Sequence, residues 1–256
     1  MSEIITERSG SILRVQLNRP AKKNAMTFKM YVTMANILND AAKDDHIHVV
    51  LWHGAGDSFC AGTDLEDLKN NLPDPYYLDS QFVLINALFN FGKPLVAAVH
   101  GAAIGVGTTM LTNCDFVYAG ESANFQMQYI NLALVPVFGT TFSLPARLGY
   151  LRAAELILLG QSFDAKRAAE LGLVTRVVSD KKLLSTATEI AQKLAEMPAG
   201  ALQACKRLMK QSSHEQVEQA MKNENEELSK RFYSADAKEA LNAFLEMRPP
   251  NFTRKE

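Results

Sequence analysis

Apolar and polar residues follow two different periods along the first 178 residues. In ILRVQL (12–17), Leu13, Val15 and Leu17 alternate with their neighbours, which predicts a half-buried strand. Other short apolar runs are continuous, as in strands that are covered on both faces. We expect such strands at 49–52, 94–99, 115–119 and 173–178.

Between these runs, apolar residues recur three and four positions apart, which is the period of a helix. Thr27 can cap a helix whose stripe is Met30, Met34, Ile37, Leu38 and Ala41. A second stripe is formed by Phe82, Ile85, Leu88 and Phe89. Asp164 can cap a further helix that ends at Gly172. The alternation of strands and helices predicts an α/β architecture.

The last third of the chain reads as almost entirely helical from Asp180 onwards. Two apolar faces stand out: Val217, Met221, Leu228 and Phe232 on one, and Ala240, Leu241, Phe244 and Leu245 on the other. Such faces can pack on a neighbouring subunit or on the chain's own core. The pattern leaves both interpretations open.

Composition narrows the functional class. The chain has 256 residues, of which 47% are apolar and 21% charged, and its net charge is −1. There is no broad basic field for nucleic acid or an anionic membrane, no signal-peptide core at the N-terminus, and no apolar run of about 18 residues. Cys60, Cys114 and Cys205 are widely spaced and odd in number, so no disulfide framework is expected. These features predict a reduced, cytoplasmic protein without a nucleic-acid or membrane partner.

Neither a metal nor a nucleotide motif is complete. His46 and His48 lie two positions apart without a third ligand nearby, so no metal is expected. The glycine-rich stretch 100–107 fits neither the GxGxxG fingerprint nor a P-loop.

Two other segments are more informative, because each runs from a strand through small residues into a helix. They are SFCAGTDL (58–65) and PLVAAVHGAAIGVG (94–107). A helix start offers free N–H groups, and glycine lets a ligand approach them. Two such amides that converge on one point form an oxyanion hole, which stabilises negative charge on a carbonyl oxygen.

With these segments the chain resembles the crotonase superfamily of enoyl-CoA hydratases and isomerases. The matching motifs span nearly the whole chain: NRPAKKNAM (18–26), SFCAGTDL (58–65), KPLVAAVHGAAIGVG (93–107), CDFVYAGESANFQ (114–126), the stretch 148–174 and the closing helices. The resemblance implies an α/β fold, a crotonase-like spiral of ββα units. It divides the chain into an acyl-CoA-binding core (1–198) and a helical C-terminal trimerisation region (199–256). It also implies an acyl-CoA or enoyl-CoA ligand, a homotrimer or dimer of trimers, and no cofactor apart from the coenzyme A of the substrate.

The resemblance assigns the oxyanion role to the amides of Thr63 and Val106, where the family usually has glycine at the second position. Ala61 and Gly62 are small enough for the ligand to approach, and Asp64 can cap the next helix. Basic residues near the C-terminus, Arg254 or Lys255, could reach the CoA phosphates, although a solvated surface role stays open for any single lysine. The residues expected to bind substrate or CoA are Lys22, Lys23, Ala25, Ala61, Gly62, Asp64, Leu65, Gly105, Thr109, Tyr129 and Val137.

The catalytic carboxylates of the family are missing. Hydration uses two carboxylates, which align with Thr109 and Tyr129, and one group of isomerases uses a glutamate that aligns with Val137. If the scaffold still holds the acyl chain as in those isomerases, Val137→Glu should introduce isomerase activity. The remaining polar groups near the expected site are Thr108, Gln126 and Gln128. Cys60 is a nucleophile on paper, but packing among small residues explains it equally simply.

We therefore expect an enzyme of the hydratase/isomerase type, a lyase or isomerase of fatty acid metabolism that polarises a thioester carbonyl. Two alternatives remain from the sequence. One is a protein that binds acyl-CoA without catalysis. The other is a CoA-thioester hydrolase or decarboxylase, which depends less on the missing carboxylates.

Overall fold

A six-stranded sheet forms the centre of the computed structural model, which describes residues 2–71 and 75–252, with the backbone alone for 75–78. The strands lie in the order β1 (Ile4–Ser9), β2 (Ile12–Leu17), β3 (Val49–Gly54), β4 (Leu95–Val99), β6 (Phe116–Gly120) and β9 (Arg176–Val178). All neighbours pair in parallel except β1 and β2. The helices between the strands make the crossovers that a parallel sheet requires.

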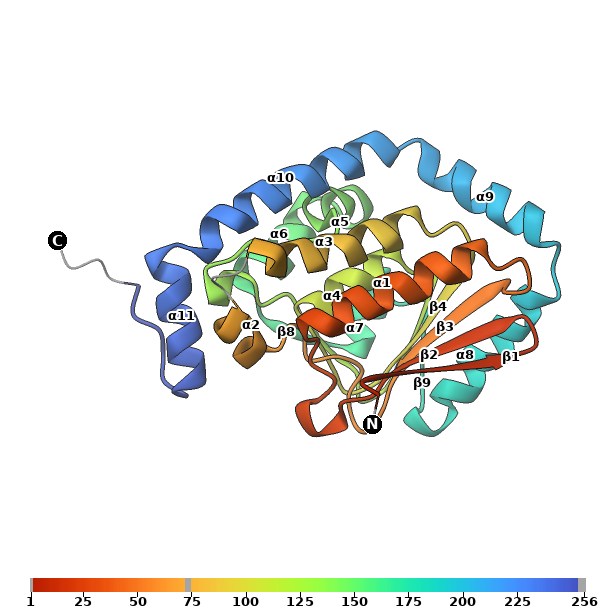
Figure 1. The fold of residues 1–256 in the computed structure, drawn as a ribbon, viewed down its shortest axis with the longest axis horizontal. Helices are drawn as coiled ribbons and strands as arrows, with labels where there is room; N and C mark the ends of the chain where they lie inside the picture. Colours follow the sequence, from red (N-terminus) through yellow and green to blue (C-terminus); the bar gives the residue numbers. More distant parts are fainter. Residues whose placement is uncertain (1, 72–74, 253–256) are drawn as a thin grey trace.

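Alternate side chains of the sheet enter two separate cores. One face packs on α8 (Asp180–Ala195), where Val49, Leu51 and Val96 meet Leu183 and Ala187. The other face joins a larger core that includes α1 (Phe28–Lys43) and α3 (Pro75–Asn90). Figure 1 shows α1 and α3 on one side of the sheet and α8 on the other. Because both faces are covered, β3 and β4 need apolar residues at nearly every position, as the sequence has them.

A second, three-stranded sheet carries the turns that matter for function. β5 (Ala102–Ile104) and β7 (Asn124–Gln126) are parallel, and β8 (Ser162–Asp164) runs antiparallel to β7. Short helices connect these parts: η1 (Pro20–Lys22), α2 (Leu65–Asn71), α4 (Val106–Thr109), η2 (Met110–Asn113), η3 (Ile130–Leu132), α5 (Thr140–Leu148), α6 (Tyr150–Leu159) and α7 (Ala165–Glu170).

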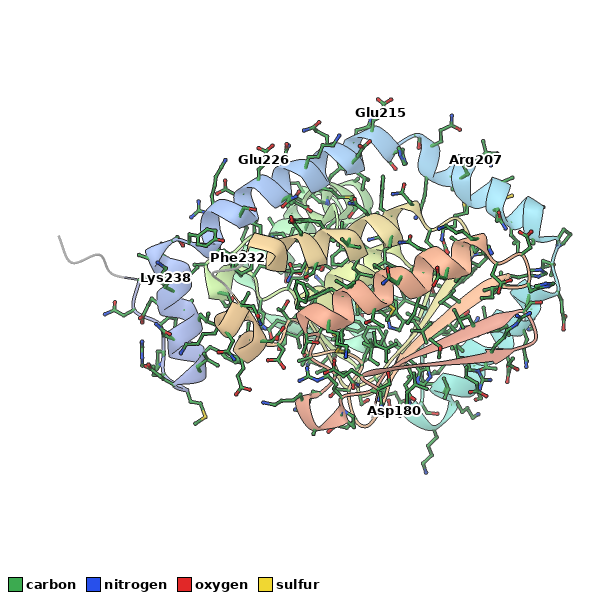
Figure 2. The ribbon with its side chains drawn as sticks, viewed as in Figure 1. Asp180, Arg207, Glu215, Glu226, Phe232 and Lys238 are labelled. Carbon is green, nitrogen blue, oxygen red and sulfur yellow. The ribbon has the colours of Figure 1, made fainter. Side chains whose placement is uncertain are left out.

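Three helices close the chain: α9 (Ala199–Gln211), α10 (His214–Phe232) and α11 (Ala235–Leu245). α10 lies against α5, and α11 lies against η3 and α2 (Figure 1). Arg207, Glu215 and Glu226 are exposed on the outer side, whereas Phe232 is 5% exposed (Figure 2). The described helices include none that is both long and apolar enough to cross a bilayer.

Local signals in the sequence placed several element ends correctly. The Thr27 hydroxyl accepts from the Met30 N–H at 3.3 Å, and the Asp164 carboxylate accepts from the Arg167 N–H at 2.7 Å. The strand expected at 173–178 is shorter, because the N–H groups of Leu173 and Val174 turn back to the Ala168 carbonyl. That closing turn of α7 uses the residues that would otherwise begin the strand.

Two other expectations were wrong or incomplete. β1 was not predicted, because Ile4 is its only buried residue and the other five residues, Ile5 included, are exposed. Phe244 does not share the buried face of α11 with Ala240 and Leu241, since 55% of Phe244 is exposed.

Candidate functional site

The two small-residue turns meet side by side. Cys60 and Ala103 form a parallel bridge, in which the Cys60 N–H donates to the Ala102 carbonyl and the Ile104 N–H donates to the Cys60 carbonyl, each at 2.9 Å. Gly62 has a φ of +95°, and a Cβ there would stand 2.8 Å from the Ile104 oxygen. Glycine is therefore required at 62 both for the backbone conformation and for the close approach of the turns.

This arrangement leaves two backbone donors free. The Met26 N–H donates to the Gly62 carbonyl and the Asp64 N–H to the Met26 carbonyl, so the intervening Thr63 N–H faces away from Met26. Val106 is the first residue of α4, where no intrahelical acceptor exists. Within the described residues neither amide has an acceptor, and both residues line one cavity.

That inner cavity has a volume of about 40 Å³ and a mostly apolar wall. Leu65, Leu68, Leu132, Leu134, Leu228 and Phe232 form the wall. Its residues with polar side chains are Thr63, Gln81, Gln128 and Tyr129. No carboxylate lines the cavity among the described residues. It can accommodate a short apolar chain next to a polarised carbonyl group.

A wider cleft of about 260 Å³ adjoins the inner cavity, and the two share Thr63, Leu65 and Gln128. Lys22, Ala25, Ala61, Asp64, Glu66, Phe244 and Leu245 also line it. Five of the residues expected to contact CoA thus lie together at this opening: Lys22, Ala25, Ala61, Asp64 and Leu65.

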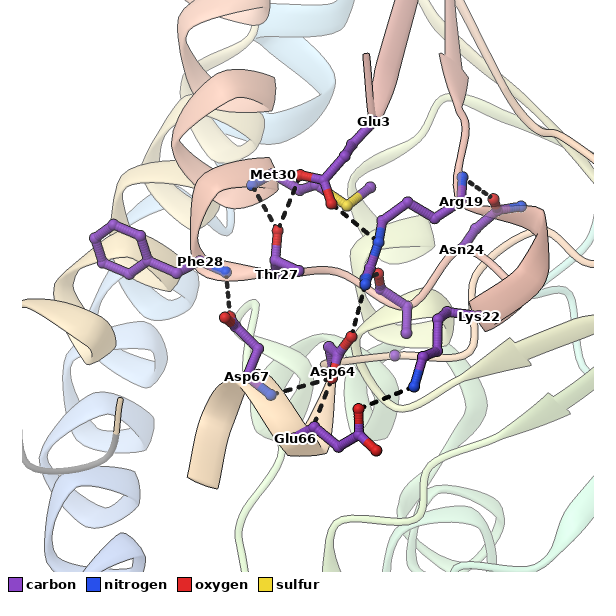
Figure 3. Close-up of polar contacts among 12 residues, drawn as sticks. Glu3, Arg19, Lys22, Asn24, Thr27, Phe28, Met30, Asp64, Glu66 and Asp67 are labelled. Carbon is purple, nitrogen blue, oxygen red and sulfur yellow. Dashed lines mark hydrogen bonds and ion pairs between the residues drawn. The ribbon is translucent and has the colours of Figure 1, made fainter. Parts of the chain in front are cut away.

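A network of charges fixes the rim of the cleft (Figure 3). Arg19 contacts Glu3 and Asp64, both at 3.0 Å, and donates to the Ala25 carbonyl at 2.6 Å. Lys22 pairs with Glu66 at 2.9 Å, and both side chains are more than half exposed. An exposed pair of this kind is weak, so its lysine is available to another anion at little cost.

Asp64 has a structural role in this network. Its carboxylate accepts from the N–H groups of Glu66 and Asp67, both at 3.1 Å, at the start of α2. Burial raises the pKa of Asp64, but the Asp67 N–H and Arg19 outweigh it, and the pKa lies below its ordinary value. Asp64 is thus an anion held by its partners and not a free base, as the expected helix cap requires.

Behind the amides, the hydroxyls of Thr109 and Tyr129 are hydrogen-bonded at 2.8 Å. Tyr129 lines the inner cavity, whereas Thr109 is fully buried behind it. Burial raises the pKa of Tyr129, and the Thr109 hydrogen bond offsets this only in part. Burial also raises the pKa of Cys60 to about 12, so this thiol is a packing residue and not a thiolate nucleophile.

The other predicted site residues lie as follows. Gly105 lines the inner cavity. Val137 is 1% exposed, belongs to the larger core and does not line the inner cavity. Lys23 is exposed with a φ of 48°, and its carbonyl accepts from the Ala61 N–H, so its backbone supports the turn. Arg254 and Lys255 lie outside the described residues.

Sequence reasoning missed the groups that hold Thr63 and those that close the cavity. The Thr63 hydroxyl is 2.8 Å from the Tyr31 hydroxyl and accepts from the Gln81 amide at 3.4 Å. Leu228 and Phe232 come from α10, more than 100 positions after Thr63 in the chain. Their helical spacing was visible, but the cavity that they line was not.

Glu224, also on α10, is a buried acid that was not singled out. It is 4% exposed, and its carboxylate accepts from the N–H groups of Gly139 and Thr141 and from the Thr141 hydroxyl, each at 2.7 Å. Burial raises the pKa of Glu224 to about 7 against these hydrogen bonds. It joins α10 to the start of α5, close to the cavity wall.

Comparison with known proteins identifies the family of this chain. The enoyl-CoA hydratase/isomerase family model matches residues 7–255. The chain belongs to this family. Within the crotonase superfamily, it is 34% identical over its full length, and over the full length of the relative, to 1,2-epoxyphenylacetyl-CoA isomerase of Escherichia coli. It is also 34% identical to 2,3-dehydroadipyl-CoA hydratase of the same organism, over 98% of this chain and 99% of the relative.

Solved members of the enoyl-CoA hydratase/isomerase family share the whole fold. The enoyl-CoA hydratase/isomerase from Pseudoalteromonas atlantica superposes with a TM-score of 0.92 at 36% identity, covering 98% of this chain and all of the other. OdaA of Pseudomonas aeruginosa superposes with a TM-score of 0.92 at 37% identity, covering 96% of this chain and 99% of OdaA. Such agreement shows that this chain has the crotonase fold.

Proposed function

We propose that this protein binds an acyl-CoA or enoyl-CoA thioester with the carbonyl oxygen between the N–H groups of Thr63 and Val106, and that it is an enzyme. The observation that carries the proposal is that Thr63 and Val106, whose N–H groups have no acceptor among the described residues, line the same inner cavity, which adjoins the outer cleft at Thr63. Preorganised backbone donors of this kind stabilise a developing oxyanion without further rearrangement. The acyl group then occupies the inner cavity and the CoA arm the outer cleft.

The proposed reaction depends on charge stabilisation at the carbonyl more than on a carboxylate pair. Thr63, Gln81, Gln128 and Tyr129 are the residues with polar side chains that line the inner cavity within the described residues. None of them is a strong base near neutral pH, because the pKa of Tyr129 is raised and amides do not titrate. We expect slow hydration and isomerisation. Thioester hydrolysis or decarboxylation is favoured within the enzyme class.

The second candidate is a CoA-thioester-binding protein without catalysis. The same lack of a lining carboxylate favours it. The two candidates agree on binding and differ in turnover, so an assay of both separates them.

The oligomer is also a proposal. Apolar side chains on α6 and α9 are exposed, with Leu151 at 83%, Leu158 at 60% and Met209 at 73%. Exposed apolar surface of this kind marks an interface between proteins. We propose a homotrimer or dimer of trimers that covers these helices.

Binding is tested by titration calorimetry with acetyl-CoA, butyryl-CoA and free coenzyme A. We expect saturable binding, tighter for the thioesters than for free coenzyme A. Absence of binding at millimolar thioester would overturn the proposed function. A chromatographic assay of the same mixtures for hydration, isomerisation, hydrolysis and loss of carbon dioxide then distinguishes an enzyme from a binding protein.

A further inference from the structure

Another cavity, with several polar side chains in its lining, lies where the C-terminal helices meet the core, away from the acyl site. Its volume is about 50 Å³, and its lining comes from α3, η2, α5 and the junction of α9 and α10. It shares no lining residue with the inner cavity or the outer cleft among the described residues. Its polar side chains include Asn113, Ser143, Arg147, Lys210 and His214.

Two buried donors of this cavity have no partner. The Nζ atom of Lys210 and the Oγ atom of Ser143 are both inaccessible to solvent and make no hydrogen bond within the described structure. The Ser143 residue is 8% exposed. A buried hydroxyl or ammonium without a partner carries the full cost of its lost hydration, so two in one cavity indicate a missing acceptor.

The charges around this cavity are unbalanced towards positive. Arg147 and Lys210 line it, and Lys206 lies close enough to lower the pKa of Lys210. Among the carboxylates, Asp115 is the one that raises the pKa of Lys210. It is already engaged, since it accepts from Lys206 at 2.7 Å and from the Leu95 N–H at 2.8 Å.

Arg147 has donors to spare. One nitrogen of its guanidinium donates to the Thr112 carbonyl at 3.0 Å.

Lys210 keeps its charge in this cavity. Burial, with a smaller contribution from Lys206, lowers the pKa of Lys210 to about 8, so the ammonium still predominates at neutral pH. His214 stacks on Phe89 with ring centroids 4.6 Å apart and borders the same cavity.

We propose that this cavity binds a small inorganic oxyanion of the phosphate or sulfate type, towards which the Lys210 and Ser143 side chains rotate as donors, with Arg147 as the second positive charge. A water molecule in the same place would leave the positive charge uncompensated. An oxyanion supplies acceptors and charge together, and charge-assisted hydrogen bonds are the stronger ones. The occupant would connect the end of α9 to α5.

The test is titration of the full chain with sodium phosphate, followed by calorimetry and by thermal unfolding at constant ionic strength adjusted with sodium chloride. Variants are Lys210→Met and Ser143→Ala, with the exposed Lys181→Met as the matched control. We expect saturable binding of phosphate and a rise of the Tm in the wild type and in Lys181→Met. Loss of one charged donor should weaken the affinity at least about tenfold in Lys210→Met.

Ser143→Ala keeps the charge and should weaken binding less than Lys210→Met does. An equal rise of the Tm with sodium chloride in place of phosphate would show general screening and overturn the proposal. Equal phosphate affinity in wild type and Lys210→Met would overturn it as well. A third result would also contradict the proposal. If Lys210→Met had a higher Tm than the wild type in every buffer, and the Tm of the wild type did not depend on phosphate, the site would be empty and its buried ammonium unpaired. None of these outcomes bears on thioester binding, which is measured separately.

Discussion

The hydroxyl groups of Thr109 and Tyr129 lie 2.8 Å apart, and the sequence predicts that these two positions correspond to the paired carboxylates of hydratases. Thr109 is fully buried and Tyr129 is 8% exposed. The two neutral groups are hydrogen-bonded in a dry environment, and neither carries a charge near neutral pH. On the predicted correspondence, this hydrogen bond stands where a hydratase has its acid–base couple.

A double-mutant cycle tests this relationship. Thr109→Val leaves the buried Tyr129 hydroxyl without this partner, so it should lower the free energy of unfolding by about 1–3 kcal/mol. Tyr129→Phe should cost less, because the Thr109 hydroxyl still donates to the Gly105 carbonyl at 3.4 Å. The double variant removes both hydroxyls and should cost less than the sum. Urea unfolding of the four proteins measures the coupling, which we expect to be about 1 kcal/mol. Additive effects would mean that the hydrogen bond contributes little.

The oxyanion amides are tested at Thr63. Thr63→Pro removes the N–H, whereas Thr63→Val keeps it and removes the hydroxyl that contacts Tyr31 and Gln81. Difference infrared spectra of bound, carbonyl-labelled butyryl-CoA should show a lowered carbonyl stretch in wild type and Thr63→Val. The shift should be lost in Thr63→Pro. If turnover is detected, Thr63→Pro should slow it, because the loss of this N–H removes about 3 kcal/mol of transition-state stabilisation.

Unchanged carbonyl polarisation in a folded Thr63→Pro variant would rule out the assignment of Thr63. A loss in Thr63→Val as well would attribute the effect to the hydroxyl or to the position of the turn. Circular dichroism of all three proteins controls for folding, because Gly62 packs directly against Ile104.

The sequence predicted what local patterns determine. The buried strands β3 and β4, the stripe of α1 and the caps at Thr27 and Asp164 all follow from residues close together in the chain. It also predicted that the turns at Gly62 and Gly105 offer amides. It did not predict the wall of the cavity, because Leu228 and Phe232 approach Thr63 only through the packing of α10. Arg19 and Glu224 were missed for the same reason, since their partners are distant in sequence.

Val137 shows the limit of alignment. The sequence suggested that Val137→Glu restores an isomerase, but the residue is 1% exposed and does not line the inner cavity. We now expect a buried carboxyl group to lower the free energy of unfolding by roughly 3 kcal/mol, without new Δ3–Δ2 isomerisation. Val137→Met, of similar size but uncharged, is the control for volume. Isomerase activity in a stable Val137→Glu variant would show that the acyl chain reaches this position.

The exposed apolar side chains predict the assembly. Tyr150, Leu151, Leu158 and Leu159 on α6 are 56–83% exposed, and Leu208 and Met209 on α9 are 62% and 73% exposed. Light scattering should give a mass of at least three times 28.3 kDa. Leu151→Glu and Leu158→Glu together should reduce that mass, because charges at a dry interface are costly. A stable wild-type monomer at micromolar concentration would contradict the proposed trimer.

The buried Glu224 predicts a pH dependence of stability. The pKa of its carboxyl is raised by burial to about 7 in the folded protein, above the ordinary 4.5. The folded state therefore binds this proton more tightly than the unfolded chain, and the resulting stabilisation is complete below about pH 4.5. It is lost as the pH rises towards 7, by an amount on the order of 3 kcal/mol. Glu224→Gln does not titrate, so its free energy of unfolding should fall less than that of the wild type between about pH 5 and pH 8.

The matched control for Glu224→Gln is Glu218→Gln, on the exposed side of the same helix, where the carboxylate pairs with Lys222 at 2.9 Å. Glu218 has its pKa lowered by the Lys222 hydrogen bond, so its small contribution has the opposite sign. Urea unfolding at a fixed protein concentration, repeated at each pH, separates the two variants. If the pH profiles of wild type and Glu224→Gln ran parallel, the carboxylate would have to be ionised throughout this range. Its three hydrogen bonds to Gly139 and Thr141 would then outweigh the cost of burial, and α10 would be held to α5 by a permanent anion.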